Sequence, residues 1–194
     1  MALLNSRETY GAVAVVLHWL IALGIILMLA AGKYMTDLEI GQFRFDLTQL
    51  HKSIGLTILA LTVLRILWRL VNKQPELPAH MGRLERLAAK STHLVFYALM
   101  LVLPLSGWAL ASASKYNIPT VYFGVIEVPH LPYVSTLPRD DKRQVEETAE
   151  EAHELLGNFT ILLLILHIAA ALKHHIRDKD DVLTRMVPFM RRRK

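Results

Sequence analysis

The chain has 194 residues with a formal net charge of +5, and 53% of its residues are hydrophobic. Its mean hydropathy of +0.33 is too high for an ordinary soluble domain. The sequence contains no cysteine, which excludes disulfides, iron–sulfur clusters, thiolate-ligated haem and the covalent attachment of c-type haem. We therefore expect one small membrane domain that covers residues 1–194.

Four apolar stretches of the sequence predict helices that cross a bilayer, which needs about 20 residues per helix. We place these spans at about 13–32, 53–70, 93–113 and 153–174. Before the third span, the segment MGRLERLAA predicts a short surface helix, and before the fourth, the acidic stretch QVEETAEEAHEL continues directly into the span. The predicted fold class is an all-α membrane protein, a bundle of four transmembrane helices.

Basic residues indicate the orientation of this bundle. Lysine and arginine are concentrated in the loop between the second and third spans and in the C-terminal tail, which ends with Arg191-Arg192-Arg193-Lys194. The positive-inside rule then places both termini in the cytoplasm. We interpret the basic tail as an orientation signal and a contact for anionic lipid, and we expect no nucleic-acid partner.

Four histidines form two pairs at matched depths in the predicted spans. His18 and His167 lie about five residues inside the cytoplasmic edge, whereas His51 and His153 lie just outside the periplasmic edge. His153 and His167 are 14 residues apart, so on one helix they are separated by ~21 Å along the axis and lie within about 40° of the same face. Each pair can supply both axial ligands of one haem b, so we expect two non-covalent b haems stacked across the bilayer.

A local pattern around the same four histidines supports this interpretation. A flat macrocycle beside a helix needs a small residue one turn from its ligand, because side chains four positions apart share a face. The residues at these positions are Ala22, Gly55, Gly157 and Ala171. A zinc or copper centre is the rival interpretation, but without cysteine or a second carboxylate at membrane depth it would lack its usual further ligands.

Three other residues are candidates for roles near these haems. His93 has the bulky Tyr97 four positions later, so we expect it beside a haem or at a quinone site rather than on iron. Arg65 lies 14 residues after His51 and is expected to pair with a haem propionate. The alternative for Arg65 is an arginine that extends to the membrane surface. Lys52, beside His51, could attract a small anionic substrate.

Several of these segments together resemble the bacterial cytochrome b561 family, which is related to the cytochrome b subunits of nickel–iron hydrogenases and formate dehydrogenases. The segments are RETYG, LHW with His18, LHKSIG with His51, LVLRILWR with Arg65, HLVFYALMLVLPLSGW, AHELLG with His153 and ILHIAAALKHH with His167. The resemblance covers nearly the whole chain except residues 114–145. It implies a multi-pass protein of the bacterial inner membrane with two b haems that exchange electrons with quinone. At least one family member is a superoxide oxidase that passes electrons to ubiquinone.

Three function classes are compatible with the sequence. The first is an oxidoreductase that takes electrons from superoxide and reduces quinone, with Lys52 and His93 as candidate substrate-site residues. The second is a quinol-linked electron-transfer subunit with a periplasmic or membrane protein partner, for which the acidic residues of 146–151 form a docking face. The third is a four-helix membrane protein without redox chemistry. The sequence gives no indication of an oligomeric state.

Overall fold

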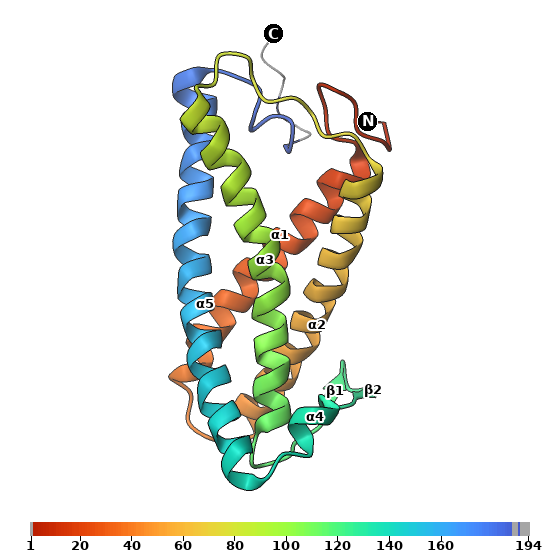
Figure 1. Ribbon diagram of the computed structural model, residues 1–194, viewed down its shortest axis with the longest axis vertical. Coiled ribbons are helices and arrows are strands. Elements are labelled where there is room, and N and C mark those ends of the chain that lie inside the picture. Colours follow the sequence, from red (N-terminus) through yellow and green to blue (C-terminus); the bar gives the residue numbers. More distant parts are fainter. Residues whose placement is uncertain (1, 188–189, 191–194) are drawn as a thin grey trace. The chain divides into compact units, whose positions relative to one another are not determined.

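The computed structural model describes residues 2–187 and residue 190. Its four long helices are α1 (Ala12–Thr36), α2 (Gln42–Val71), α3 (Arg83–Ala113) and α5 (Arg139–Lys173), as Figure 1 shows. Each of these helices is long and apolar enough to cross a membrane. The prediction of a mostly helical protein with four membrane-spanning segments is therefore confirmed for the described part of the chain.

The helices extend further than the apolar stretches. Helix α2 begins at Gln42, because its polar first turns can continue the helix beyond the apolar segment, and α5 contains the acidic stretch as expected. The surface helix predicted for MGRLERLAA is not separate, since residues from Arg83 onward are the first turns of α3. Pro104 lies inside α3 without ending it, as membrane helices tolerate proline when neighbouring groups satisfy the freed backbone.

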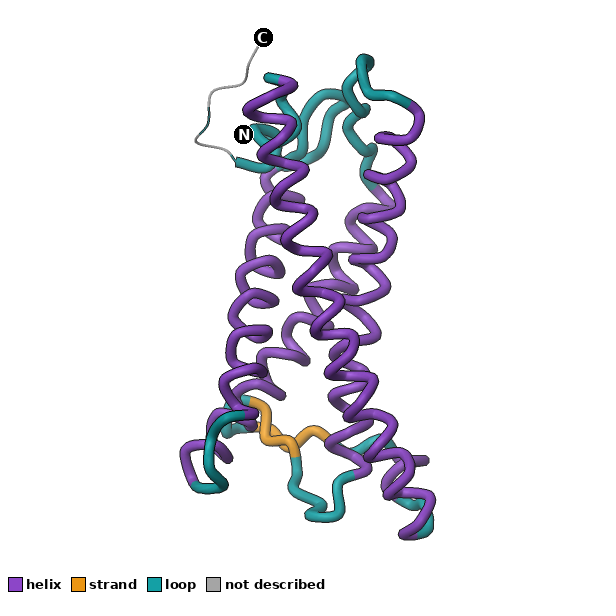
Figure 2. The backbone as a smooth tube through the Cα atoms, turned by 90° about the vertical axis from the view of Figure 1, so that its left-hand side faces the viewer, coloured by secondary structure: helices purple, strands orange, loops and turns teal. Residues whose placement is uncertain are grey.

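A small β-hairpin and a short helix occupy the connection between α3 and α5. Strand β1 (Thr120–Tyr122) pairs antiparallel with β2 (Ile126–Val128), and helix α4 (Pro132–Ser135) follows. Figure 2 shows the two strands in orange. At the turn, Phe123 and Gly124 have φ values of 47° and 74°, a left-handed conformation that glycine adopts without strain. The all-α prediction did not include this hairpin.

The contacts divide the chain into two compact units. Unit 1 comprises the described residues of Met1–Ala22, Leu61–Ala98 and Thr160–Lys194, and unit 2 comprises Leu23–Ala60 and Leu99–Phe159. Each long helix contributes residues to both units. His18, His93 and His167 belong to unit 1, whereas His51 and His153 belong to unit 2.

The helices bury small and polar residues and expose large apolar ones. Thr62, Ser53 and Ser112 are the largest side chains that are fully buried in the described residues. Many large hydrophobic side chains of the spans are exposed, among them Leu23, Leu67, Leu94 and Leu162. This pattern is typical of membrane helices, whose packing relies on small residues while the apolar surface contacts lipid.

Candidate functional site

In unit 2, the structure brings His51 of α2 and His153 of α5 together. Their ring centres lie 6.3 Å apart and the ring planes are inclined by 71°. A metal–imidazole bond is about 2 Å long and the ring centre lies about 1.2 Å further on, so two imidazoles on opposite sides of one metal ion have centres about 6.4 Å apart. The observed spacing therefore fits two axial ligands of a single iron.

The hydrogen bonds of His153 leave one ring nitrogen available for a metal. Its Nδ1 lies 3.1 Å from the backbone carbonyl oxygen of Leu103 and 3.0 Å from Oγ of Ser106. Because a carbonyl oxygen can only accept, Nδ1 must carry the proton in this contact, which leaves the lone pair on Nε2. This orientation is the one that metal-binding histidines usually have.

Helix α3 approaches the ring of His153 closely at Gly107. A Cβ atom at this position would lie 3.1 Å from Cε1 and 3.4 Å from Nδ1 of His153. Gly107 and Ser106 therefore position the ring from α3. From the sequence, Gly107 was expected only as a possible kink of the third span, and neither residue was assigned to the site. The only signal for them is that the small pair Ser-Gly interrupts large apolar residues in the third span.

The surroundings of His51 include free space for a bulky group. Its Nδ1 is buried and has no hydrogen-bond partner in the described part of the chain. One turn along α2, a Cβ atom at Gly55 would meet nothing within 4 Å, and at Gly157 on α5 it would meet only Cδ2 of Leu29, at 4.0 Å. The small residues expected beside the two histidines thus adjoin open space that suits a flat macrocycle.

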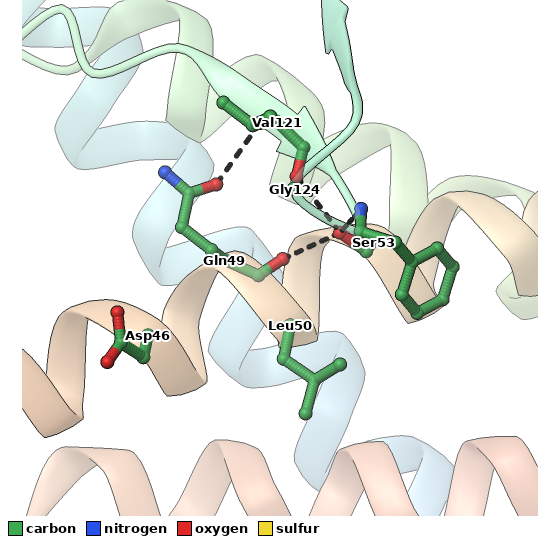
Figure 3. A pocket seen from close by; sticks show the side chains of 7 residues that line it. Asp46, Gln49, Leu50, Ser53, Val121 and Gly124 are labelled. Atoms are coloured by element: carbon green, nitrogen blue, oxygen red, sulfur yellow. Dashed lines mark hydrogen bonds between the residues drawn. The ribbon is translucent and has the colours of Figure 1, made fainter.

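One face of α2 is fixed to the β-hairpin, and this face is opposite to His51. Gln49 accepts a hydrogen bond from the amide of Val121 at 3.3 Å (Figure 3). Ser53 accepts one from the amide of Phe123 at 3.0 Å. Thr57, one turn further, lies 3.0 Å from the hydroxyl of Tyr122. Because residues 49, 53 and 57 lie on one helical face, residue 51 points to the other side. The hairpin therefore sets the rotation of the turn that carries His51.

A shallow cavity of about 260 Å³ lies on this hairpin face (Figure 3). It is lined by Asp46, Gln49, Leu50, Ser53, Val121, Phe123 and Gly124. The side-chain oxygens of Gln49 and Ser53 already accept hydrogen bonds from backbone amides of the hairpin. Asp46 gives the cavity a negative charge. The cavity is therefore unsuited to an anion, and it lies away from the face of α2 that carries His51.

Lys52, a candidate substrate-site residue, is held against the same connection. Its Nζ donates to the carbonyl oxygen of Pro119 at 3.3 Å, and Gln49 donates to that oxygen at 2.9 Å. The lysine side chain is half-buried. No carboxylate forms an ion pair with it in the described residues, so its positive charge is not neutralised by a direct contact.

In unit 1, three histidines surround the predicted cytoplasmic site. The ring centre of His167 lies 6.4 Å from that of His18 and 5.9 Å from that of His93, and Phe96 contacts it at 5.3 Å. The His18–His167 spacing matches the separation of about 6.4 Å worked out above for two axial ligands. His93 lies directly beside His167, at a shorter ring-centre distance than His18, and its expected place beside a haem or at a quinone site stays a prediction.

Arg65 contacts the His18 side of this cluster. Its Nη2 lies 3.3 Å from Nδ1 of His18, its Nε donates to the hydroxyl of Tyr97 at 3.3 Å, and Nη1 donates to the carbonyl of Ala14 at 3.4 Å. A guanidinium can only donate, so Nδ1 of His18 is unprotonated here and the proton sits on Nε2. Metal binding through Nε2 requires Arg65 to release Nδ1. No carboxylate of the described residues pairs with Arg65.

Two tyrosines that the sequence interpretation did not select complete the polar surroundings. The guanidinium carbon of Arg69 lies 5.6 Å from the ring centre of Tyr97, a cation–π contact. Tyr10 precedes α1, and burial raises the pKa of its phenol while the nearby Arg69 and Arg65 oppose this shift. Two arginines and two phenols thus gather in unit 1 close to His18, which suits the binding of carboxylates.

Known proteins resemble this chain over nearly its whole length. The family model of the prokaryotic cytochrome b561 matches residues 9–189. A relative from Escherichia coli (strain K12), cytochrome b561 homolog 2, is 34% identical over 189 residues, which cover 96% of this chain and 95% of the relative. A relative from Yersinia pestis, named probable superoxide oxidase CybB, is 28% identical and aligned over 95% of this chain and 99% of its own length. The chain belongs to the prokaryotic cytochrome b561 family of transmembrane electron-transfer haem proteins and is a multi-pass bacterial membrane protein.

Proposed function

We propose that the chain holds two b haems, one between His51 and His153 in unit 2 and one between His18 and His167 in unit 1. The observation that carries this proposal is that both pairs have ring centres at 6.3–6.4 Å. The open space at Gly55 and the free Nε2 of His153 support it further. Zinc is disfavoured at both pairs, because among the described residues neither pair belongs to a group of three ligand atoms within 4.8 Å of one another, although His93 lies beside His167.

When bound, haem b takes up and releases single electrons. Each haem would be held by two imidazoles, from His51 and His153 in unit 2 and from His18 and His167 in unit 1. The residues of the chain then act by position and charge. Leu103 and Ser106 orient His153 through Nδ1, and Gly107 sets the closeness of α3 to the ring.

Arg65 is the proposed partner of a propionate of the haem in unit 1. Its guanidinium lies within reach of His18 and has no carboxylate partner in the described residues. A propionate would draw Arg65 from Nδ1 of His18, and the ring proton could then occupy Nδ1 and free Nε2 for iron. We place quinone near His93, Arg65 and His18, where imidazole and guanidinium donors are available to a carbonyl oxygen.

Superoxide is the proposed electron donor and quinone the proposed acceptor, in the bacterial inner membrane. The name of the Yersinia pestis relative, a probable superoxide oxidase, supports this choice. Lys52 lies next to His51 in sequence and carries a positive charge without a carboxylate partner among the described residues. A positive charge attracts a small anion, and added salt weakens this attraction.

A second candidate function rests on the acidic first half of α5. Glu147, Glu150 and Glu151 are exposed, and within the described part of the chain only Glu147 of these three forms an ion pair, with Arg143 at 2.8 Å. Such a surface favours a cationic protein, so the alternative is a quinol-linked electron-transfer subunit with a periplasmic or membrane protein partner.

The test is a superoxide-driven reaction in lipid vesicles that contain the purified protein and ubiquinone. A xanthine oxidase system supplies superoxide, and the b-type absorption band and the quinone are followed together. The proposal predicts that superoxide reduces the haems and then the quinone, and that superoxide dismutase abolishes both signals. Haem reduction by quinol alone, with no response to superoxide, would overturn the superoxide assignment and favour the partner protein.

A further inference from the structure

The connection between α3 and α5 contains few charged residues for a segment outside the long helices. Residues 116–138 carry a single formal charge, at Glu127, whereas loops that face water are usually polar. The large apolar and aromatic side chains exposed in this segment are Tyr116, Ile118, Phe123, Val125, Ile126 and Tyr133. All of them belong to unit 2. An exposed apolar surface of this kind marks contact with another molecule or with a membrane.

The turn of the β-hairpin carries a large apolar side chain where small polar ones are preferred. Phe123 and Gly124 have φ values of 47° and 74°. Turns with two successive positive φ values prefer asparagine, aspartate or glycine at the first position, because a bulky side chain is strained there. Val125 and Ile126 follow and are 80% and 60% exposed. The backbone of the turn therefore disfavours this phenylalanine, and contact with an apolar phase would compensate the strain.

Contacts between the hairpin and α2 determine how deep the turn lies. Amides of β1 and of the turn residue Phe123 donate to Gln49 at 3.3 Å and to Ser53 at 3.0 Å, and the hydroxyl of Tyr122 lies 3.0 Å from Oγ1 of Thr57. The contacts thus advance over two turns of α2, ~12 Å along its axis, into the apolar segment of the helix. The turn is therefore the part of the hairpin that lies nearest the middle of the span.

Side chains of α2 also satisfy the backbone groups along one edge of β1. The amides of Val121 and Phe123 donate to Gln49 and Ser53, and the carbonyl oxygen of Pro119 accepts from Gln49 at 2.9 Å. Backbone groups without a partner are costly beside lipid, where water cannot replace the missing hydrogen bond. This edge of the hairpin is therefore compatible with a position where water is scarce.

The hairpin lies on the face of α2 that is turned away from the proposed haem of unit 2. The ring of His51 faces that of His153 on α5, with 6.3 Å between their centres, and the residues that hold the hairpin lie on the opposite face of α2. The exposed turn is therefore continuous with the outer surface of a membrane-spanning helix.

We propose that the turn Phe123–Ile126 inserts into the interfacial region of the bilayer, beside the first apolar turns of α2, and anchors the hairpin there. The occupant of this surface is lipid, at the boundary between headgroups and acyl chains. The turn has no charge that would oppose insertion, and the exposed rings of Tyr116 and Tyr133 suit the headgroup level, where tyrosine is enriched. A water-soluble partner protein would need the turn in water, whereas the contacts with α2 direct it toward the span.

Spin labelling of the haem-containing protein tests this proposal, and the chain has no cysteine that would compete for the label. Val125→Cys carries a nitroxide in vesicles of phosphatidylethanolamine and phosphatidylglycerol, and power saturation compares access of oxygen, which concentrates in lipid, with access of a water-soluble nickel chelate. Leu27→Cys is the reference for lipid, as an exposed residue of α1, and Asp141→Cys is the reference for water, as an exposed residue 12 positions before His153. We expect oxygen to relax the Val125 label more than the chelate does, as at Leu27 and opposite to Asp141.

A charge in the turn separates insertion from packing against the protein. With the label at Ile126→Cys, the added substitution Val125→Asp should lower the ratio of oxygen access to chelate access, whereas the matched control Val125→Leu should leave it unchanged. Haem content measured in the same samples reports folding. A Val125 label as accessible to the chelate as the Asp141 label would overturn the proposal. Protection of that label from both reagents would also overturn it, since a second copy of the chain would then cover the turn. An Ile126 label that does not respond to Val125→Asp would contradict anchoring by the turn.

Discussion

Replacement of Gly107 by alanine tests how closely α3 must approach His153. The added Cβ would lie 3.1 Å from Cε1 of the ring, so the ring must move by about 0.3 Å to reach an ordinary contact. Overpacking of this kind costs about 1–3 kcal/mol. If the substitution destabilises only the haem-bound state by this amount, the haem of unit 2 binds about 5- to 150-fold more weakly.

The assay is the rate at which haem passes from the purified protein to an excess of apomyoglobin. Gly24→Ala is a matched control, because its Cβ would lie 3.2 Å from Cδ1 of Ile58, which is the flexible end of a side chain and not a proposed ligand. We expect one of the two haems to leave Gly107→Ala faster, while Gly24→Ala behaves as the wild type. Equal rates in the two variants would refute the claim that Gly107 positions a haem ligand.

Three further predictions concern charge and hydrogen bonding. Arg65→Ala should keep both haems but lower the reduction potential of one, because a cation near a propionate favours the reduced form; two unchanged midpoints in a redox titration would contradict this. Lys52→Glu should slow haem reduction by superoxide in stopped-flow experiments, less so at high salt, while reduction by quinol and the control Lys115→Glu stay near wild type. Equal loss with both donors would count against a superoxide site at Lys52. Ser106→Ala should raise the potential of the haem in unit 2, since the Nδ1–H of His153 loses an acceptor and the ring becomes a weaker electron donor. A fall in that potential would show that the tautomer is wrong.

The apolar stretches predicted the four spans because membrane helices are specified by length and hydropathy alone. The pairing of His51 with His153, and of His18 with His167, followed from their depths, and the structure brings both pairs within 6.3–6.4 Å. Ligation itself remains a prediction. Depth could be inferred from sequence because a helix has a constant rise per residue.

The contacts that orient these histidines depend on residues far apart in the sequence. The sequence shows that Gln49 and Ser53 are polar residues on one face of α2, but their hydrogen-bond partners in the hairpin lie about 70 residues later in the chain. Strands of three residues carry almost no periodic signal, so the hairpin was not predicted. The contact of Arg65 with His18 depends on side-chain direction, which spacing along one helix does not determine.

The central claim is that four particular histidines hold two haems, and the haem content of single variants tests it most directly. Haem per chain is measured by the pyridine haemochrome method in the wild type and in alanine variants of His18, His51, His153, His167 and His93. We predict two haems in the wild type and in His93→Ala, and one haem in each of the other four variants. Loss of a haem in His93→Ala, together with two haems in His18→Ala, would show that His93 rather than His18 is the partner of His167.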